Sequence, residues 1–159
     1  MNTNSQTSRI LISERLTLRK LSKNDAEEIL KLRSNTEVNK YLNREPGKTV
    51  EDVLTFIKMI IENESDELFY WAITKTDEDK AIGTICLFDF STDLEKCEIG
   101  YELLPEYQGQ EIMTEAAKKV IEYAINILGV KTLEALTHKD NQSSTKLLQK
   151  LNFHQNYNI

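Results

Sequence analysis

The chain has 159 residues, of which 40% are hydrophobic and 29% charged, an ordinary composition for one folded domain with its own core. Its formal net charge of -6 argues against general nucleic-acid binding, which needs a basic surface. No apolar run approaches the roughly 20 residues of a transmembrane helix, so no membrane partner is expected.

The N-terminus and the cysteines indicate an intracellular setting. Residues 1–9 are polar, so they predict a disordered tail and no signal peptide, with a single domain over residues 10–159. Cys86 and Cys97 lack CxxC spacing and nearby histidines, so no metal site is implied. We interpret them as two buried thiols in a reducing cytosol and expect a cytoplasmic protein.

The N-terminal part of the chain predicts a strand followed by helices. Residues 15–19 alternate polar and apolar side chains, as a half-buried strand does. Ser22, with Asp25 three residues later, resembles a capping box and begins a helix over about residues 23–33. Thr49 caps another helix. The apolar side chains of that helix share one face: Val50, Val53, Leu54, Ile57, Ile60 and Ile61.

The middle of the chain predicts a meander of three strands. They cover residues 68–73, 81–90 and 96–104 and are separated by polar turns. Pro105 ends the third strand, because proline cannot donate to a strand ladder. In this third strand one face carries Cys97, Ile99, Tyr101 and Leu103, and the other carries Glu98, Gly100 and Glu102.

A long amphipathic helix follows from about Ile112. Its core-facing stripe repeats every four residues, while Glu115 and its polar neighbours are expected to face water. Gly129 stops the helix, residues 131–137 predict a strand, and Asn141 caps a last helix. This order of elements predicts an α/β fold, antiparallel first and parallel around the central helix.

The turn between the third strand and the central helix is suited to an anion. A turn that feeds the first turn of a helix presents several unpaired backbone N–H groups at one point. The helix dipole adds a partial positive charge there. We therefore expect a phosphate or pyrophosphate site, which local N–H groups can form even in an acidic chain.

Four segments in this order resemble the GNAT superfamily of acetyl-CoA-dependent N-acetyltransferases, and within it the ribosomal-protein N-terminal (Rim-type) branch. They are residues 13–19, the Ile-Gly strand at 81–85, the cofactor motif at 98–116, and the Asn-x-x-Ser segment with Lys-Leu-Asn-Phe at 141–153. The resemblance implies a mixed, mostly antiparallel sheet with helices on both faces. It also implies a parallel, splayed strand pair around the central helix.

The resemblance further implies an enzyme that moves an acetyl group from acetyl-CoA, its co-substrate, to a primary amine by direct attack in a ternary complex. The acceptor is either a protein N-terminus, as the branch suggests, or a small amine. Net acidity fits a cationic acceptor such as a basic ribosomal protein or a polyamine. An antibiotic-modifying acetyltransferase is a third alternative.

The cofactor residues are carried over from the family motif. The family's pyrophosphate loop reads Gln/Arg-x-x-Gly-x-Gly/Ala; Gln108 fits it, whereas Glu111 and Met113 stand at the two glycine positions. The amide of Leu103 or Leu104 is implied to polarise the thioester oxygen. The expected cofactor contacts are Leu103, Leu104, Gln108, Gly109, Gln110, Glu111, Ile112, Met113, Thr114 and Asn141.

Glu111 is the main departure from the family. A glycine there lets the backbone approach the pyrophosphate, whereas a glutamate is strained if the position needs a positive φ. A carboxylate facing the phosphates would repel them and would weaken cofactor binding by at most roughly a thousandfold. The alternative role is helix stabilisation by a first-turn acid. We expect the side chain to face solvent, so that acetyl-CoA binding survives, and we expect Glu111→Gly to tighten it.

Two residues are candidates for proton transfer. Glu98 lies on the strand beside the cofactor motif and is a candidate base if burial raises its pKa; a solvated strand glutamate fits the pattern equally. Ser144 matches the family position proposed to protonate the leaving thiolate, or it is an ordinary first-turn serine. Asn141 resembles the residue that bonds the pantetheine arm and can also serve as a plain N-cap.

A non-catalytic binding module of the same fold is the rival hypothesis. It is motivated by Glu111 and by the end of the chain at Ile159, where the family continues through another strand. If that strand is missing, an exposed sheet edge would be free to pair with a second chain, forming a homodimer.

Overall fold

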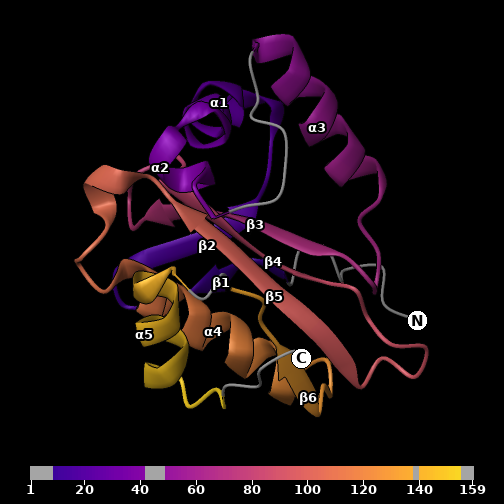
Figure 1. Ribbon diagram of the computed structural model, residues 1–159. Coiled ribbons are helices and arrows are strands. Elements are labelled where there is room, and N and C mark those ends of the chain that lie inside the picture. The colour runs from indigo at the N-terminus through magenta and orange to yellow at the C-terminus, as the bar shows by residue number, and fades with distance from the viewer. Residues whose placement is uncertain (1–8, 42–48, 138–139, 155–159) are drawn as a thin grey trace.

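Six strands form one mixed sheet in the computed structural model, which describes residues 9–41, 49–137 and 140–154 (Figure 1). The strands are β1 (Leu11–Ile12), β2 (Leu16–Lys20), β3 (Phe69–Lys75), β4 (Gly83–Phe88), β5 (Lys96–Leu103) and β6 (Thr132–Glu134). They lie in the sheet in chain order, and only β5 and β6 are parallel. The mixed, mostly antiparallel sheet expected from the sequence is confirmed.

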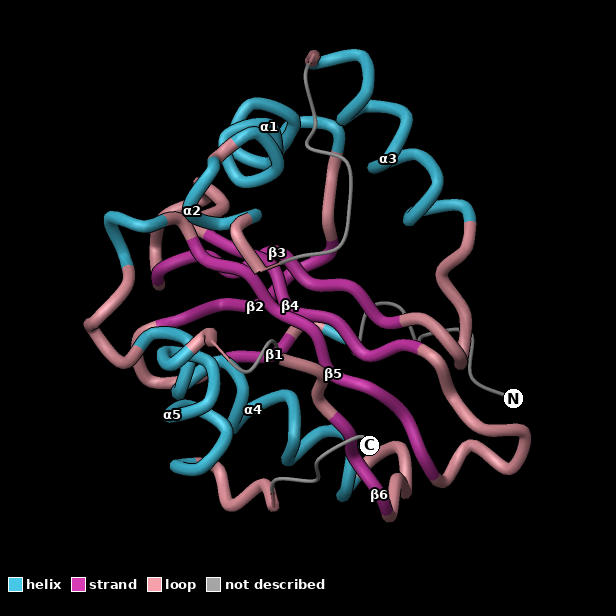
Figure 2. Tube along the Cα trace, viewed as in Figure 1, coloured by secondary structure: helices cyan, strands magenta, loops and turns pink. Residues whose placement is uncertain are grey.

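Helices cover both faces of this sheet (Figures 1 and 2). One face carries α1 (Ala26–Ser34), α2 (Thr36–Asn39) and α3 (Val50–Glu62), and the other carries α4 (Ile112–Asn126) and α5 (Gln142–Lys150). The short 3-10 helices η2 (Lys23–Asp25) and η3 (Pro105–Tyr107) precede α1 and follow β5. A separate hydrophobic core fills the space on each side of the sheet. None of the helices in the described ranges is both long and apolar enough to cross a bilayer.

Local side-chain caps begin the helices as the sequence predicts. Ser22 and Asp25 form the expected capping box, in which the Ser22 hydroxyl accepts from Asn24 N and the Asp25 carboxylate accepts from Ser22 N. The Thr49 hydroxyl accepts from the backbone of Asp52 at 3.1 Å. Each cap satisfies one of the amides that a helix N-terminus otherwise leaves unpaired.

The apolar stripe of α3 is narrower than predicted. Val53, Ile57 and Ile60 are buried, but the other three predicted members lie at the margin, between 37% and 43% exposed. By contrast, the predicted stripe of α4 is buried at Ile112, Ala116, Val120 and Ala124. The two helices differ because α4 packs directly against the sheet, at β1 and β2, whereas α3 packs mainly against α1.

The N-terminal boundary needs a correction at Arg9. The sequence assigned this residue to a disordered tail, yet its side chain is buried and donates from Nη2 to the Ser65 carbonyl at 2.8 Å. Its guanidinium lies 4.0 Å from the Phe69 ring centroid, a cation–π contact. The remainder of the predicted tail, residues 1–8, lies outside the described residues.

The parallel pair at the end of the sheet is short. β5 and β6 are in register only over Lys96–Thr132, Cys97–Leu133 and Glu98–Glu134. Beyond Glu98, β5 continues to Leu103 while β6 ends, so the strand predicted over residues 131–137 is shorter than expected. The open side of β5 therefore faces α4 and α5 at the point where the candidate site lies.

Candidate functional site

The turn between β5 and α4 has the backbone geometry of an anion site. Gly109 (φ 78) and Glu111 (φ 64) both adopt the left-handed conformation. The first bond of α4 runs from Glu115 N to Glu111 O, at 3.1 Å. The amides between these two residues, those of Ile112, Met113 and Thr114, therefore receive no partner within the helix and point out of its N-terminus. This arrangement fits the diphosphate of a nucleotide cofactor.

The Glu111 carboxylate is turned away from those amides. Its two oxygens accept from Lys150 Nζ at 2.7 and 2.8 Å, and its side chain makes no capping hydrogen bond. The side chain is 60% exposed, in agreement with the solvent-facing position expected from the sequence. The hydrogen bond and charge of Lys150 hold the pKa of Glu111 below its ordinary value.

An ion-pair network braces the other side of the turn. Glu115 was expected to face water, but its carboxylate accepts from the Ser13 hydroxyl (2.5 Å), Arg15 N (2.7 Å) and Arg15 Nε (2.6 Å). Burial raises the pKa of Glu115, but these hydrogen bonds outweigh it and keep the pKa below its ordinary value. Arg15 Nη1 also donates to the Gln110 carbonyl at 3.0 Å, which ties the segment between β1 and β2 to the turn.

The two glutamines of the turn also act as braces. Gln108 Nε2 donates to the Leu103 carbonyl at 3.0 Å, and the Gln108 backbone amide donates to the Pro105 carbonyl at 3.1 Å. Gln110 Nε2 donates to the Glu106 carbonyl at 3.2 Å. Both side chains thus fix the turn against the end of β5.

The register of β5 distinguishes the two amides considered for the thioester oxygen. Leu104 N donates to Ile82 O at 3.0 Å, so the amide of Leu104 is occupied. Leu103 pairs with Gly83, the next step along the ladder from the bonded Leu104–Ile82 pair. Backbone groups of successive residues in a strand point to opposite sides, so the N–H of Leu103 points away from β4 and towards the open side of β5. Leu103, and not Leu104, therefore presents the candidate oxyanion donor.

A tyrosine–serine pair lies on the same open side. The hydroxyls of Tyr101 and Ser144 are 2.5 Å apart, joining β5 to the first turn of α5. Burial raises the pKa of Tyr101, and the contact with Ser144 partly offsets that rise. The Asn141 side chain accepts from Ser144 N at 3.1 Å, so it caps α5 as expected. The sequence left Tyr101 as a core residue or a pocket wall, with the core favoured, and strand alternation gives no signal that its hydroxyl reaches Ser144.

Glu98 lies apart from this group. It is the last residue of β5 paired with β6, and its partner there is Glu134. Burial, followed by the charges of Asp89 and Glu134, raises the pKa of Glu98, while Lys96 lowers it. Leu103 is five residue steps further along the strand, about 16 Å along the backbone. Glu98 also projects to the sheet face opposite Tyr101, so direct contact with the other candidates is excluded.

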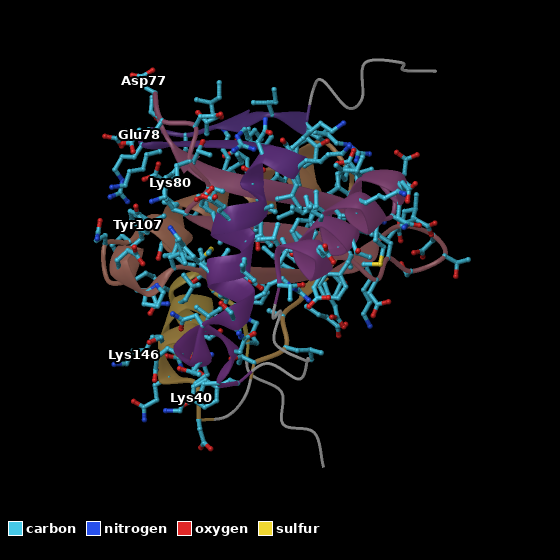
Figure 3. The ribbon with its side chains drawn as sticks, turned by 90° about the horizontal axis from the view of Figure 1, so that it is seen from above. Lys40, Asp77, Glu78, Lys80, Tyr107 and Lys146 are labelled. Carbon is cyan, nitrogen blue, oxygen red and sulfur yellow. The ribbon has the colours of Figure 1, made fainter. Side chains whose placement is uncertain are left out.

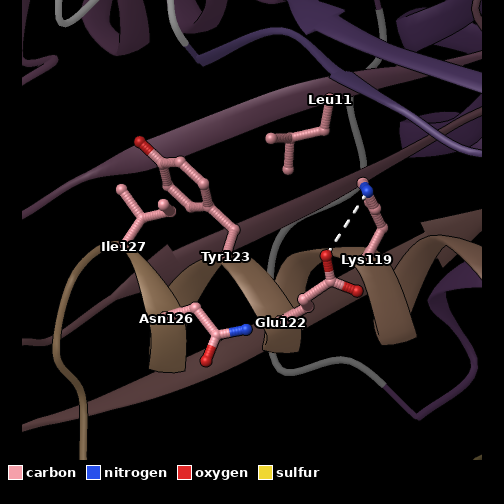
Figure 4. Close-up of a pocket in the computed structure, with 6 residues that line it drawn as sticks. All are labelled: Leu11, Lys119, Glu122, Tyr123, Asn126 and Ile127. Carbon is pink, nitrogen blue, oxygen red and sulfur yellow. Dashed lines mark ion pairs between the residues drawn. The ribbon is translucent and has the colours of Figure 1, made fainter.

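A surface pocket elsewhere does not belong to the site. It lies between β1 and the C-terminal half of α4, beside the Lys119–Glu122 ion pair (Figure 4). The turn and the open side of β5 contribute no lining residue to it. Within the described part of the chain, no cluster of histidine, cysteine and acidic side chains is arranged to hold a metal ion.

Comparison with known proteins gives a consistent family. A model described as an acetyltransferase (GNAT) domain matches residues 15–154. The uncharacterized N-acetyltransferase YoaA of Bacillus subtilis strain 168 is 32% identical over 145 residues, covering 91% of this chain and 82% of YoaA. Spermidine N(1)-acetyltransferase of Escherichia coli K12 is 26% identical over 136 residues, covering 86% of this chain and 71% of that protein.

A solved structure shares the fold. The crystal structure of a GNAT-family acetyltransferase from Bacillus anthracis superposes with a TM-score of 0.79 at 22% sequence identity. The match covers 89% of this chain and 81% of that one. The splayed parallel pair and the helices on both faces are thus features of a known architecture.

Proposed function

Because the chain belongs to the acetyltransferase (GNAT) family and is an N-acetyltransferase with acetyl-CoA as its donor, we propose that a primary amine attacks the thioester directly in a ternary complex. The observation that carries this proposal is the end of the β5–β6 pairing at Glu98, beyond which the Leu103 amide faces the open side of β5. Bound acetyl-CoA supplies the activated acetyl group.

The first role of the chain is to bind and orient the donor. The amides of Ile112, Met113 and Thr114 receive the diphosphate, assisted by the dipole of α4. The pantetheine arm runs along the open side of β5, where Asn141 borders it. The Leu103 amide donates to the thioester oxygen and stabilises the negative charge that develops there. Removing one such donor typically costs a factor of about 10²–10³ in rate.

The second role is to move two protons. As the amine nitrogen bonds to the carbonyl carbon and the carbon–sulfur bond breaks, the Ser144 hydroxyl gives its proton to the leaving sulfur. Tyr101, 2.5 Å from Ser144 between the hydroxyl oxygens, orients that hydroxyl. Glu98 takes the proton that the amine loses. Since it lies about 16 Å along β5 from Leu103, which is too far for direct transfer or for a single bridging water, it must act through a chain of several waters. After product release a proton from solvent restores the Ser144 hydroxyl, and Glu98 gives to solvent the proton that it took.

The acceptor is a cationic molecule with a primary amine. The net charge of -6 favours such a partner, and one relative is named for spermidine. The resemblance of residues 13–19 to the Rim-type branch instead favours a protein N-terminus. Spermidine and a basic peptide with a free N-terminus are therefore the two acceptors to compare.

Release of free CoA thiol, measured with each acceptor, tests the proposal. We expect saturable release with at least one of them, and a product heavier by one acetyl group in mass spectrometry. A thermal shift with acetyl-CoA but no turnover with any amine would instead support the binding-module alternative. No shift at millimolar acetyl-CoA would contradict donor binding itself.

A further inference from the structure

An acid stands at a place where it should obstruct an anionic ligand. Glu111 is the N-cap residue of α4, and the three unpaired amides follow it directly. A carboxylate at a helix N-terminus is attracted to those amides and to the helix dipole. Left alone, the Glu111 side chain would occupy the anion site or repel a diphosphate from it.

The structure shows what draws this carboxylate elsewhere. Lys150, at the end of α5, contacts both of its oxygens and is separated from Glu111 by 39 residues in sequence. Thr114 and Lys118 of α4 also face the carboxylate, but Lys150 has the largest influence on it. The pairing is therefore a long-range contact between the two helices on this side of the sheet.

We propose that Lys150 is a positioning residue for the donor: it holds the Glu111 carboxylate off the backbone amides of residues 112–114 and cancels its charge, so that the turn can accept a diphosphate. This inference rests on the proposed function. It makes Glu111 and Lys150 a coupled pair, in which the lysine is needed only because the glutamate is present.

The size of the effect follows from charge separation. Two unit charges about 4 Å apart interact by an amount that corresponds to about fivefold in affinity in bulk water and about a thousandfold at an effective dielectric of 20. The site is at the surface, so the lower part of this range applies. We expect loss of Lys150 to weaken acetyl-CoA binding by about tenfold.

A double-mutant cycle tests the pair by titration calorimetry with acetyl-CoA. The variants are Lys150→Met, Glu111→Gln and the double variant, with Lys150→Gln as a second substitution at the lysine. Lys146→Met is the matched control, because Lys146 is exposed on the same helix one turn earlier (Figure 3). S-acetylpantetheine, which carries the thioester but no diphosphate, is the control ligand.

The proposal expects Lys150→Met to lose about tenfold in affinity for acetyl-CoA, while the double variant stays within about threefold of Glu111→Gln. Lys146→Met should resemble the wild type, and S-acetylpantetheine binding should be unchanged throughout. An equal loss on removing Lys150 with or without Glu111 would mean that the lysine contacts the donor directly and would overturn the inference. No loss in either background would overturn it as well.

The wild-type titration separates this inference from the proposed function. If wild-type protein binds acetyl-CoA but the cycle shows no coupling, only the positioning role fails. If wild-type protein does not bind acetyl-CoA, the proposed function fails and takes the positioning role with it.

Discussion

Glu115→Gln should loosen the turn that begins α4. The wild-type carboxylate accepts three hydrogen bonds of 2.5 to 2.7 Å from Ser13 and Arg15, and its side chain is only 18% exposed. A glutamine side chain keeps one carboxylate oxygen as an acceptor, but its NH₂ group replaces the other oxygen and faces a group that is itself a donor. Hydrogen bonds to charged groups contribute about 1.5–3 kcal/mol each, and one is lost outright.

We therefore expect a loss of about 2 kcal/mol in the free energy of unfolding, which lowers Tm by about 4–8 °C in a chain of this length. The matched control is Glu122→Gln on the same helix. Its side chain is 61% exposed and its pair with Lys119 spans 3.5 Å, so about 0.5 kcal/mol or less should be lost.

The stability that Glu115 contributes should depend on pH. The pKa of Glu115 is held below its ordinary value of 4.5 in the folded chain. Its contribution is therefore present above about pH 4.5 and is lost as the pH falls through the lower folded pKa. Urea unfolding at pH 7 and at decreasing pH measures this. A Glu115→Gln variant as stable as Glu122→Gln at pH 7 would refute the network as a support of the turn.

Three further changes test the site. Glu111→Gly should have a Tm about 3 °C above that of Glu111→Ala, because only glycine adopts the left-handed conformation without strain. Both variants should bind acetyl-CoA more tightly than wild type. Equal Tm values for the two variants would contradict the positive φ at residue 111. Glu98→Gln should lower kcat by about a hundredfold. Because the pKa of Glu98 is raised in the folded chain, the variant should also lose an acidic limb of the pH–rate profile that lies above pH 4.5, and it should be more stable than wild type near pH 7. An unchanged pH–rate profile would exclude Glu98 as the base. Ser144→Ala should lower kcat by about a hundredfold and Tyr101→Phe by less, both with little change in acetyl-CoA affinity; a wild-type kcat in Ser144→Ala would remove it as the proton donor.

Local features of the fold were predictable because they depend on near neighbours in sequence. The caps at Ser22, Thr49 and Asn141 all form as expected. Gly129 adopts a φ of 77, the left-handed conformation predicted for a helix stop. Strand boundaries were less accurate at the ends of the sheet. β1 is two residues long, too short for any periodicity to show, and it was missed.

The contacts that shape the candidate site were not predictable from pattern. Glu115 reaches Arg15 across 100 positions, and Tyr101 reaches Ser144 across 43. Periodicity tells which face of an element is buried but not which polar group will meet it there. Glu115 was therefore assigned to solvent, although an acid in the first turn of α4 is close enough to the segment between β1 and β2 to be bound by Ser13 and Arg15.

A crystal structure of the chain with acetyl-CoA tests the central claim most directly. The account predicts the diphosphate on the amides of residues 112–114, the Glu111 carboxylate still on Lys150, and the thioester oxygen about 3 Å from Leu103 N. Acetyl-CoA bound away from this turn, or a thioester oxygen that meets no amide on the open side of β5, would contradict it.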